Sequence, residues 1–255
     1  MRIATWNVNS VIARSEILTG WLAKHKPDVA CLQETKCVDD RFPTSQIEEL
    51  GYHLALFGQA AYNGVAVLSR QPIEIIRRGM PSDAEDAQRR LVDIRTGDVR
   101  IINVYVPNGE RVGSAKYAFK LEWFAKLRQY LDEHCQPDEN LILCGDFNVA
   151  PDARDVHDPM LWEGRIMFSE PERNALKHVQ EWGLADLFRQ HHDEAGLFTW
   201  WDYRAGAFRR NQGLRIDHVF GTRSMVSRCV GVEIERTVRS LERPSDHAPV
   251  VAEFL

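Results

Sequence analysis

The stretch that decides the fold is Ser245-Asp246-His247-Ala248-Pro249-Val250-Val251-Ala252-Glu253-Phe254. It sets a carboxylate beside an imidazole, directly before an apolar run that we predict to be a strand over residues 249–254. A strand end holds adjacent side chains stiffly, so Asp246 and His247 there can serve one metal-assisted reaction. An Asp-His pair taken alone is common in surface loops, so its interpretation depends on the rest of the chain.

Four further predicted strands carry acid or amide side chains at or near an end. Residues 2–7 lead to Asn7, residues 28–33 to Gln33 and Glu34, residues 140–145 to Asp146 and Asn148, and residues 214–220 contain Asp217. An Asx turn or a helix cap would explain any single one. Five such positions together are hard to explain by caps, because a carboxylate ending a buried strand is costly unless it is paired or bound to a cation. The pattern predicts a site for a hard cation and a phosphate.

The rest of the chain predicts an α/β fold in one domain, residues 1–255, although two small domains are an alternative at this length. Further strands are expected over residues 52–57, 64–69, 73–78, 90–95, 99–105 and 229–236, and helices over 12–25, 44–50, 114–134 and 171–182. Residues 152–170 lack clear periodicity and are expected to form a surface loop. Strands with interspersed helices permit two packed sheets with outer helices.

The net charge of −5 argues at first against a nucleic-acid partner. Residues 204–215, however, contain four arginines and no acid, and they lie between Trp200 and Asp217. A charge run is usually a solvated face, but this position favours a phosphate track that includes Arg209, Arg210 and Arg215.

Nothing in the composition indicates a membrane protein. No apolar stretch approaches the length of a membrane span, and Met1 leads directly into the first predicted strand. The five cysteines are odd in number and scattered, which is typical of core thiols in a reducing compartment. We therefore expect a cytoplasmic protein without a membrane partner, and a monomer.

Several motifs together resemble one family. They are, in order, Asn7, Gln33-Glu34-Thr35-Lys36, Tyr105-Val106-Pro107-Asn108-Gly109, Gly145-Asp146-Phe147-Asn148, Trp200-Trp201-Asp202-Tyr203, Leu214-Arg215-Ile216-Asp217 and Ser245-Asp246-His247-Ala248-Pro249. The set resembles the exonuclease III family of DNA repair nucleases and extends over residues 2–254. That resemblance implies a four-layer α/β sandwich, in which two packed, mainly antiparallel sheets are flanked by helices and the active site lies at one end of the sheets.

The resemblance also implies roles for the motif residues. Glu34 would be the principal ligand of Mg²⁺, with Mn²⁺ as a substitute, and Asn7 and Asp246 would complete the metal site. Asp146 would orient or deprotonate the attacking water, Asn148 and Asn108 would contact the phosphate, His247 would donate to a phosphate oxygen, Asp217 would hold His247, and Tyr105 would supply a hydroxyl. A second cation at Asp146, Asn148 and His247 stays open, as does the identity of the general base.

Three apolar residues match the family's pocket for a flipped abasic sugar, namely Trp200, Leu214 and Ile216. Because two adjacent tryptophans on a strand cannot both face inward, we assign Trp200 to the pocket and Trp201 to the core.

The implied function is magnesium-dependent hydrolysis of double-stranded DNA 5′ to abasic sites, together with trimming of blocked 3′ ends as a 3′→5′ exonuclease and 3′-phosphatase. Asn108 stands where the bacterial type enzyme has Gln, and the 152–170 segment with Arg165 and Met167 borders the site, so the balance of activities stays open. The alternatives are a phosphatase acting on inositol or lipid phosphates and a catalytically silent DNA-binding module. The complete acid set argues against silence, and Trp200 with the arginine run argues against a small-molecule phosphatase.

Overall fold

The computed structural model describes residues 1–81, 83–84 and 87–255. Two six-stranded sheets dominate it, in the orders β13-β14-β1-β2-β4-β3 and β5-β6-β7-β8-β12-β9. The first contains β13 (Cys229–Ile234), β14 (Val250–Phe254), β1 (Arg2–Asn7), β2 (Val29–Gln33), β4 (Val65–Ser69) and β3 (His53–Phe57). The second contains β5 (Glu74–Arg78), β6 (Leu91–Thr96), β7 (Val99–Tyr105), β8 (Leu141–Asp146), β12 (Asp217–Gly221) and β9 (Ala185–Asp186). A short ribbon pairs β10 (Trp200–Trp201) with β11 (Gly213–Leu214).

The two sheets mirror each other in their pairing. Each has one parallel pair near its middle, β1 with β2 and β7 with β8, and the other named pairs are antiparallel. The carboxyl ends of a parallel pair meet at the same edge of a sheet. The predicted site residues follow these ends, which explains how positions far apart in the sequence come together.

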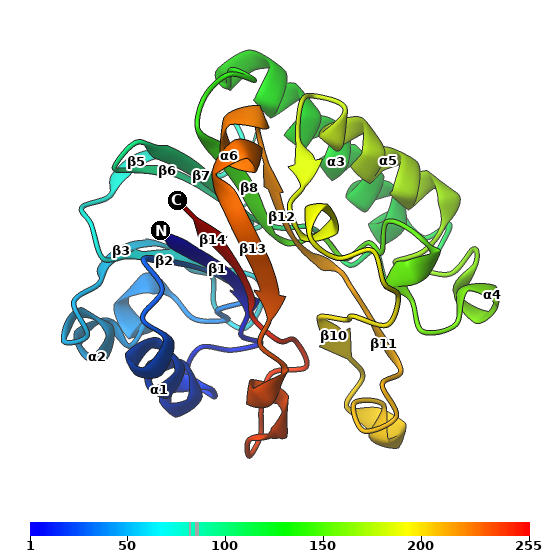
Figure 1. The fold of residues 1–255 in the computed structure, drawn as a ribbon, viewed down its shortest axis with the longest axis horizontal. Coiled ribbons are helices and arrows are strands. Elements are labelled where there is room, and N and C mark those ends of the chain that lie inside the picture. Colours follow the sequence, from blue (N-terminus) through cyan, green and yellow to red (C-terminus); the bar gives the residue numbers. More distant parts are fainter. Residues whose placement is uncertain (82, 85–86) are drawn as a thin grey trace.

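The helices are α1 (Ser15–His25), α2 (Thr44–Glu48), α3 (Ala115–His134), α4 (Pro159–Trp162), α5 (Glu170–Gln180) and α6 (Arg223–Arg228). Of these, α1 and α2 cover the outer face of the first sheet, and α3 and α5 cover that of the second (Figure 1). Three apolar clusters fill the spaces between successive layers. One joins α1 and α2 to the first sheet, one lies between the sheets, and one joins the second sheet to α3 and α5. Three buried interfaces define four layers, so the predicted four-layer α/β sandwich is confirmed.

Most predicted elements agree with the structure within about two residues at each end, as expected for assignments from periodicity. Three predictions were wrong. The strand expected over 214–220 is split, because β11 ends at Leu214 and β12 begins at Asp217. The 152–170 segment holds α4 and a 3₁₀ turn, both begun by Asp side-chain caps, instead of being a plain loop. Phe119, which helical periodicity over 114–134 places on the same face as Trp123 and Leu127, is exposed instead of buried.

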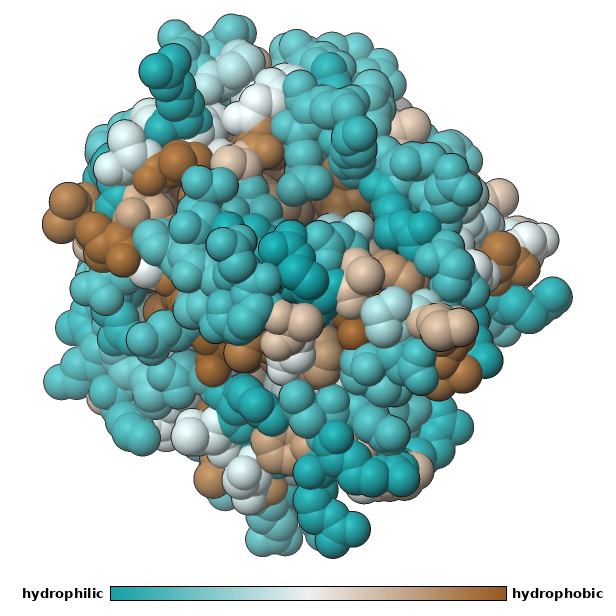
Figure 2. Space-filling model, turned by 45° about the vertical axis from the view of Figure 1, so that its right-hand side comes forward, coloured by the Kyte–Doolittle hydropathy of each residue, from teal (hydrophilic) through white to brown (hydrophobic). Residues whose placement is uncertain are grey.

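Within residues 1–81, 83–84 and 87–255, no helix is long and apolar enough to cross a bilayer. The face drawn in Figure 2 is mostly hydrophilic, and its apolar side chains are scattered over it.

Candidate active site

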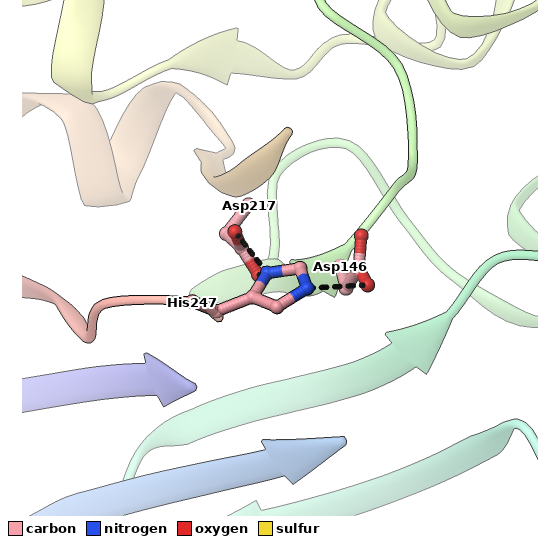
Figure 3. A group of neighbouring side chains, drawn as sticks. All are labelled: Asp146, Asp217 and His247. Carbon is pink, nitrogen blue, oxygen red and sulfur yellow. Dashed lines mark hydrogen bonds and ion pairs between the residues drawn. The ribbon is translucent and has the colours of Figure 1, made fainter. Parts of the chain in front are cut away.

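An imidazole lies between two carboxylates at one end of the sheets (Figure 3). Asp146 ends β8 and Asp217 begins β12, and these two residues are register partners in the antiparallel pair. His247 comes from the loop before β14, in the other sheet. Its Nδ1 is 2.8 Å from Asp217 Oδ2, and its Nε2 is 3.8 Å from Asp146 Oδ2. All three side chains are buried.

This arrangement sets the charge of His247. Burial alone would lower the pKa of the imidazole, but Asp217 first and Asp146 second raise it to about 10. Burial raises the pKa of Asp146 to about 7, with Asp217 adding to the rise and His247 opposing it. Near neutral pH the site therefore holds a protonated imidazole beside a carboxyl group that is poised to exchange a proton.

Asp146 is fixed by two donors and by an unusual backbone. Asn7 Nδ2 donates to Asp146 Oδ2 at 2.8 Å, and the Asn148 amide donates to Oδ1 at 2.9 Å. The preceding Gly145 has φ +145°, and a Cβ there would lie 1.9 Å from the Val104 carbonyl oxygen. Only glycine permits this approach of β8 to β7, so the sequence Gly145-Asp146 positions the carboxylate.

Asn108 and Asn148 form a pair of amides beside Asp146. Asn148 has a left-handed backbone, φ 52°, and its Oδ1 accepts from Asn108 Nδ2 at 3.0 Å. A lysine that sequence analysis missed holds both residues from below, because Lys120 Nζ donates to the carbonyls of Asn108 and Asn148 at 3.0 and 2.7 Å. Lys120 forms an ion pair with Glu172, and both side chains are fully buried. No local pattern marked them, because a lysine on an amphipathic helix usually faces solvent.

Tyr105 lies at the end of β7, and its half-buried ring contacts the Arg90 guanidinium. The Arg90 guanidinium is 4.5 Å from the centre of the Tyr105 ring. Burial, with Glu34 and Asp146 nearby, raises the pKa of the Tyr105 hydroxyl well above its usual value. The hydroxyl therefore remains a hydrogen-bond donor near neutral pH. A groove of about 620 Å³ opens beside Tyr105 and Asn108.

Glu34 follows β2 and belongs to the same site, since its charge acts on Tyr105. Its Oε1 is 2.9 Å from Lys36 Nζ, which also donates to Asn9 Oδ1 at 2.6 Å. Its neighbour in the motif, Gln33, is a structural residue, because it is buried and donates to Asn103 Oδ1 of the opposite sheet at 2.7 Å. At the end of β2, Gln33 is therefore a buried structural residue, and the next residue, Glu34, is a partly exposed carboxylate.

Asp246 accepts two hydrogen bonds, from Asn9 Nδ2 and from the Trp200 indole, both at 2.9 Å. Burial would raise the pKa of this carboxyl, but His247 and the two hydrogen bonds hold it below its usual value. Asp246 therefore stays ionised next to His247. Trp200, predicted to line a sugar pocket, is also the residue that orients Asp246.

The other two predicted pocket residues are closed off. Leu214 and Ile216 have no exposed surface, and they share an apolar cluster with Met167, against which Trp200 packs. Met167 has a left-handed backbone, φ 70°, and is itself buried. The cluster fills the place where we predicted a pocket. Trp201 is fully buried, in agreement with its prediction as a core residue.

The predicted arginine track divides in two. Arg209 and Arg210 are exposed. Arg215 is not part of the track, because its guanidinium is buried and donates to Asp155 at 2.6 Å and to Asp186 at 2.8 Å. The prediction that Arg215 contacts substrate is wrong, since its charge is used to neutralise two acids that lie 60 and 29 residues away in the sequence.

The comparisons with known proteins agree with this geometry. A sequence profile described as the endonuclease/exonuclease/phosphatase family matches residues 4–247, and the chain belongs to that family. Exodeoxyribonuclease III of Haemophilus influenzae is 38% identical over 266 residues, with 100% of both chains covered.

Two solved structures are similar over the whole chain. A 3′ phosphatase from Neisseria, NExo, bound to a product DNA hairpin, has a TM-score of 0.96 at 41% identity, covering 100% of this chain and 99% of that one. An AP endonuclease from Archaeoglobus fulgidus has the same TM-score at 38% identity and the same coverage. The predicted membership of the exonuclease III branch is confirmed, as is the prediction of a hydrolase of the nuclease class.

Proposed function

We propose that the protein is a metal-dependent phosphodiesterase of DNA repair, which trims blocked 3′ ends and, as a second activity, cuts the backbone 5′ to abasic sites. The observation that carries the proposal is the juxtaposition of Asp146 with a protonated His247 at 3.8 Å. Phosphoryl transfer needs a group that orients and deprotonates the attacking water and a cation that neutralises the phosphate. These two side chains supply one of each.

The other residues have roles that follow from their contacts. Asp217 keeps His247 protonated and oriented through its bond to Nδ1. Tyr105 and the paired amides of Asn108 and Asn148 offer neutral donors to phosphate oxygens, which suits a site where charge develops during reaction. Asn7 fixes Asp146 by donating to its carboxylate. Because the pKa of Asp146 is about 7, the carboxylate form that would accept a proton from the attacking water predominates only above that pH.

The donor set fits a hard divalent cation. Carboxylate and amide oxygens are the ligands that Mg²⁺ prefers, and Glu34 with Asn9 already holds one positive charge, the Lys36 ammonium. We propose Mg²⁺, with Mn²⁺ as a substitute, at Glu34, Asn7 and Asp246. When bound, the cation neutralises phosphate charge. A second cation at Asp146, Asn148 and His247 is disfavoured because a protonated imidazole has no lone pair to offer.

The closed apolar cluster favours 3′-end trimming over abasic incision. A flipped sugar needs a preformed pocket, whereas a terminal 3′ phosphate reaches the site without flipping. Met167 packs with Leu214 and Ile216, two of the residues assigned to that pocket. Met167→Gly, which suits the left-handed backbone, should raise abasic incision relative to 3′-phosphate removal. The exposed Met160 of α4 is the matched control, and Met160→Gly should leave the ratio unchanged.

We further propose that the chain acts as a single domain, residues 1–255, and as a monomer in the cytoplasm. In support of a single domain, one apolar cluster joins side chains from both sheets.

A digestion panel tests the proposed function. Purified protein with Mg²⁺ is given a 3′-phosphate duplex, an abasic duplex, a blunt duplex and an inositol phosphate, and Asp146→Asn is the inactive control. We expect the 3′-phosphate duplex to be cleaved fastest and the inositol phosphate not at all. Release of phosphate only from the inositol phosphate would contradict the proposal, and so would cleavage of DNA that Asp146→Asn performs equally well.

A further inference from the structure

Two loops at the cation site are locked together in an uncommon conformation. The loop after β1 and the loop after β2 are joined by backbone hydrogen bonds from Ser10 to Glu34 and from Val11 to Thr35, 2.8 and 3.0 Å long. Four non-glycine residues in these loops have left-handed backbones, with φ between 46° and 85°: Asn9, Ser10, Glu34 and Lys36. Such conformations persist only where the surroundings hold them.

The Lys36 ammonium is one of the groups that hold them. It contacts Glu34 Oε1 at 2.9 Å and Asn9 Oδ1 at 2.6 Å, so one positive charge bridges the two loops through oxygen atoms. Both side chains of the ion pair are shielded, with 26% and 19% of the Lys36 and Glu34 side chains exposed. Charge-assisted bonds of this kind are stronger than neutral ones, particularly when water is partly excluded.

We propose that Lys36 is an internal counter-cation of the metal site, which holds Glu34 and Asn9 in place before a cation binds and must leave Glu34 when it does. The inference depends on the proposed role of Glu34 as metal ligand. The same oxygen atoms are offered to an ammonium and to a divalent cation, and the lysine stem is long and flexible enough to swing away. Lys36 therefore keeps the loops ordered between turnovers and weakens cation binding at the same time.

Removing the charge of Lys36 should raise the affinity for Mn²⁺ and lower the unfolding temperature of the cation-free protein. Lys36→Met should bind Mn²⁺ about tenfold more tightly than wild type, because no charge-assisted bond has to be broken first. In the presence of a chelator the same variant should unfold at a lower temperature than wild type, since Glu34 then lacks a partner. Added Mg²⁺ should raise its Tm more than it raises that of wild type.

The experiment measures free Mn²⁺ by electron paramagnetic resonance and Tm with chelator or Mg²⁺, for the full chain. Lys36→Gln is the second neutral variant, included so that a packing defect of Met at position 36 cannot decide the result. Lys126→Met is the matched control, because Lys126 forms an ion pair with Glu122 on the outer helix α3, and it should match wild type in both measurements.

The outcomes separate this inference from the proposed function. If Glu34→Gln binds Mn²⁺ as wild type does, Glu34 is not a ligand and the proposed metal site fails. If Glu34→Gln loses Mn²⁺ but both neutral variants at Lys36 bind it no more tightly than wild type, only the counter-cation role is refuted. A raised KM for DNA with unchanged Mn²⁺ affinity would also refute that role and would place Lys36 on the substrate.

Discussion

Asp217→Asn should change the pH dependence of the reaction, so that the loss of rate is small at low pH and grows as the pH rises. The substitution keeps the shape of the side chain but removes the charge that most strongly raises the pKa of His247, which is about 10 in the intact site. Burial then lowers the pKa of the imidazole against the two remaining carboxylates that raise it, Asp146 and Asp246. If the pKa falls to the ordinary 6.5, about 3% of His247 is protonated at pH 8, which costs roughly 30-fold in rate.

The direction of the pH effect depends on which protonation state of His247 the reaction needs. His247 donates to phosphate only when protonated, so the loss grows as pH rises through the new pKa and is about twofold at pH 6.5. In wild type, by contrast, activity should rise as Asp146 loses its proton near pH 7 and fall only near pH 10. Asp217 and His247 also act on the pKa of Asp146, in opposite directions, so the part of the profile above pH 8, where Asp146 is ionised, reports on His247.

Single-turnover rates on a 3′-phosphate duplex between pH 6 and pH 9 are the appropriate assay. His247→Asn should show a ratio to wild type that falls little with pH, because it has no imidazole to titrate. The double variant should be little slower than His247→Asn, since Asp217 acts through the imidazole. A pH-independent loss in Asp217→Asn, or losses that multiply fully in the double variant, would show that the two residues are not a functional pair.

Three further variants test the site and its support, and a fourth tests the DNA face. Asp146→Asn should abolish turnover yet bind DNA nearly as well as wild type by fluorescence anisotropy, because water activation matters only on the way to the transition state; equal losses in both would contradict this role. Trp201→Ala should lower the free energy of unfolding in urea by roughly 3–5 kcal/mol, and a change under about 1 kcal/mol would be inconsistent with its burial. Arg215→Met should be similarly destabilising, by about 3–5 kcal/mol, because it removes the buried cation that Asp155 and Asp186 share and leaves Arg189 to pair with Asp155. Arg210→Ala should leave stability unchanged but reduce the salt dependence of DNA binding, and an unchanged salt dependence would remove Arg210 from the DNA face.

Local patterns in the sequence predicted the strands and the polar residues at their ends, whereas the four layers were implied by the resemblance to a family. Apolar runs of strand length ending in acids or amides identify β1, β2 and β8 and their polar exits, and parallel pairing then brings Asn7, Glu34 and Asp146 to one end. Periodicity likewise located both ends of α3 within about one residue, and those of α1 and α5 within about three.

What the sequence did not predict depends on partners that are distant in the chain. Arg215 sits in an arginine-rich segment and looks like its exposed neighbours, and only the fold shows that Asp155 and Asp186 surround it. Met167 looks like an ordinary loop residue until its left-handed backbone places it among Leu214 and Ile216. Side-chain burial of this kind is a property of tertiary packing, which a one-dimensional pattern does not contain.

Because the two sheets mirror each other, each carries only part of the proposed active site, and neither could catalyse the reaction alone. One sheet and its loops carry Asn7, Glu34 and His247, and the other carries Tyr105, Asp146 and Asp217. The bonds from Asn7 to Asp146 and from His247 to Asp217 therefore both cross the seam between the sheets. A displacement of about 1 Å at that seam would separate donor from acceptor with every strand intact. The apolar side chains between the sheets therefore maintain the distance between the proposed catalytic groups. Turnover should depend on that distance as directly as on any residue proposed to contact the phosphate.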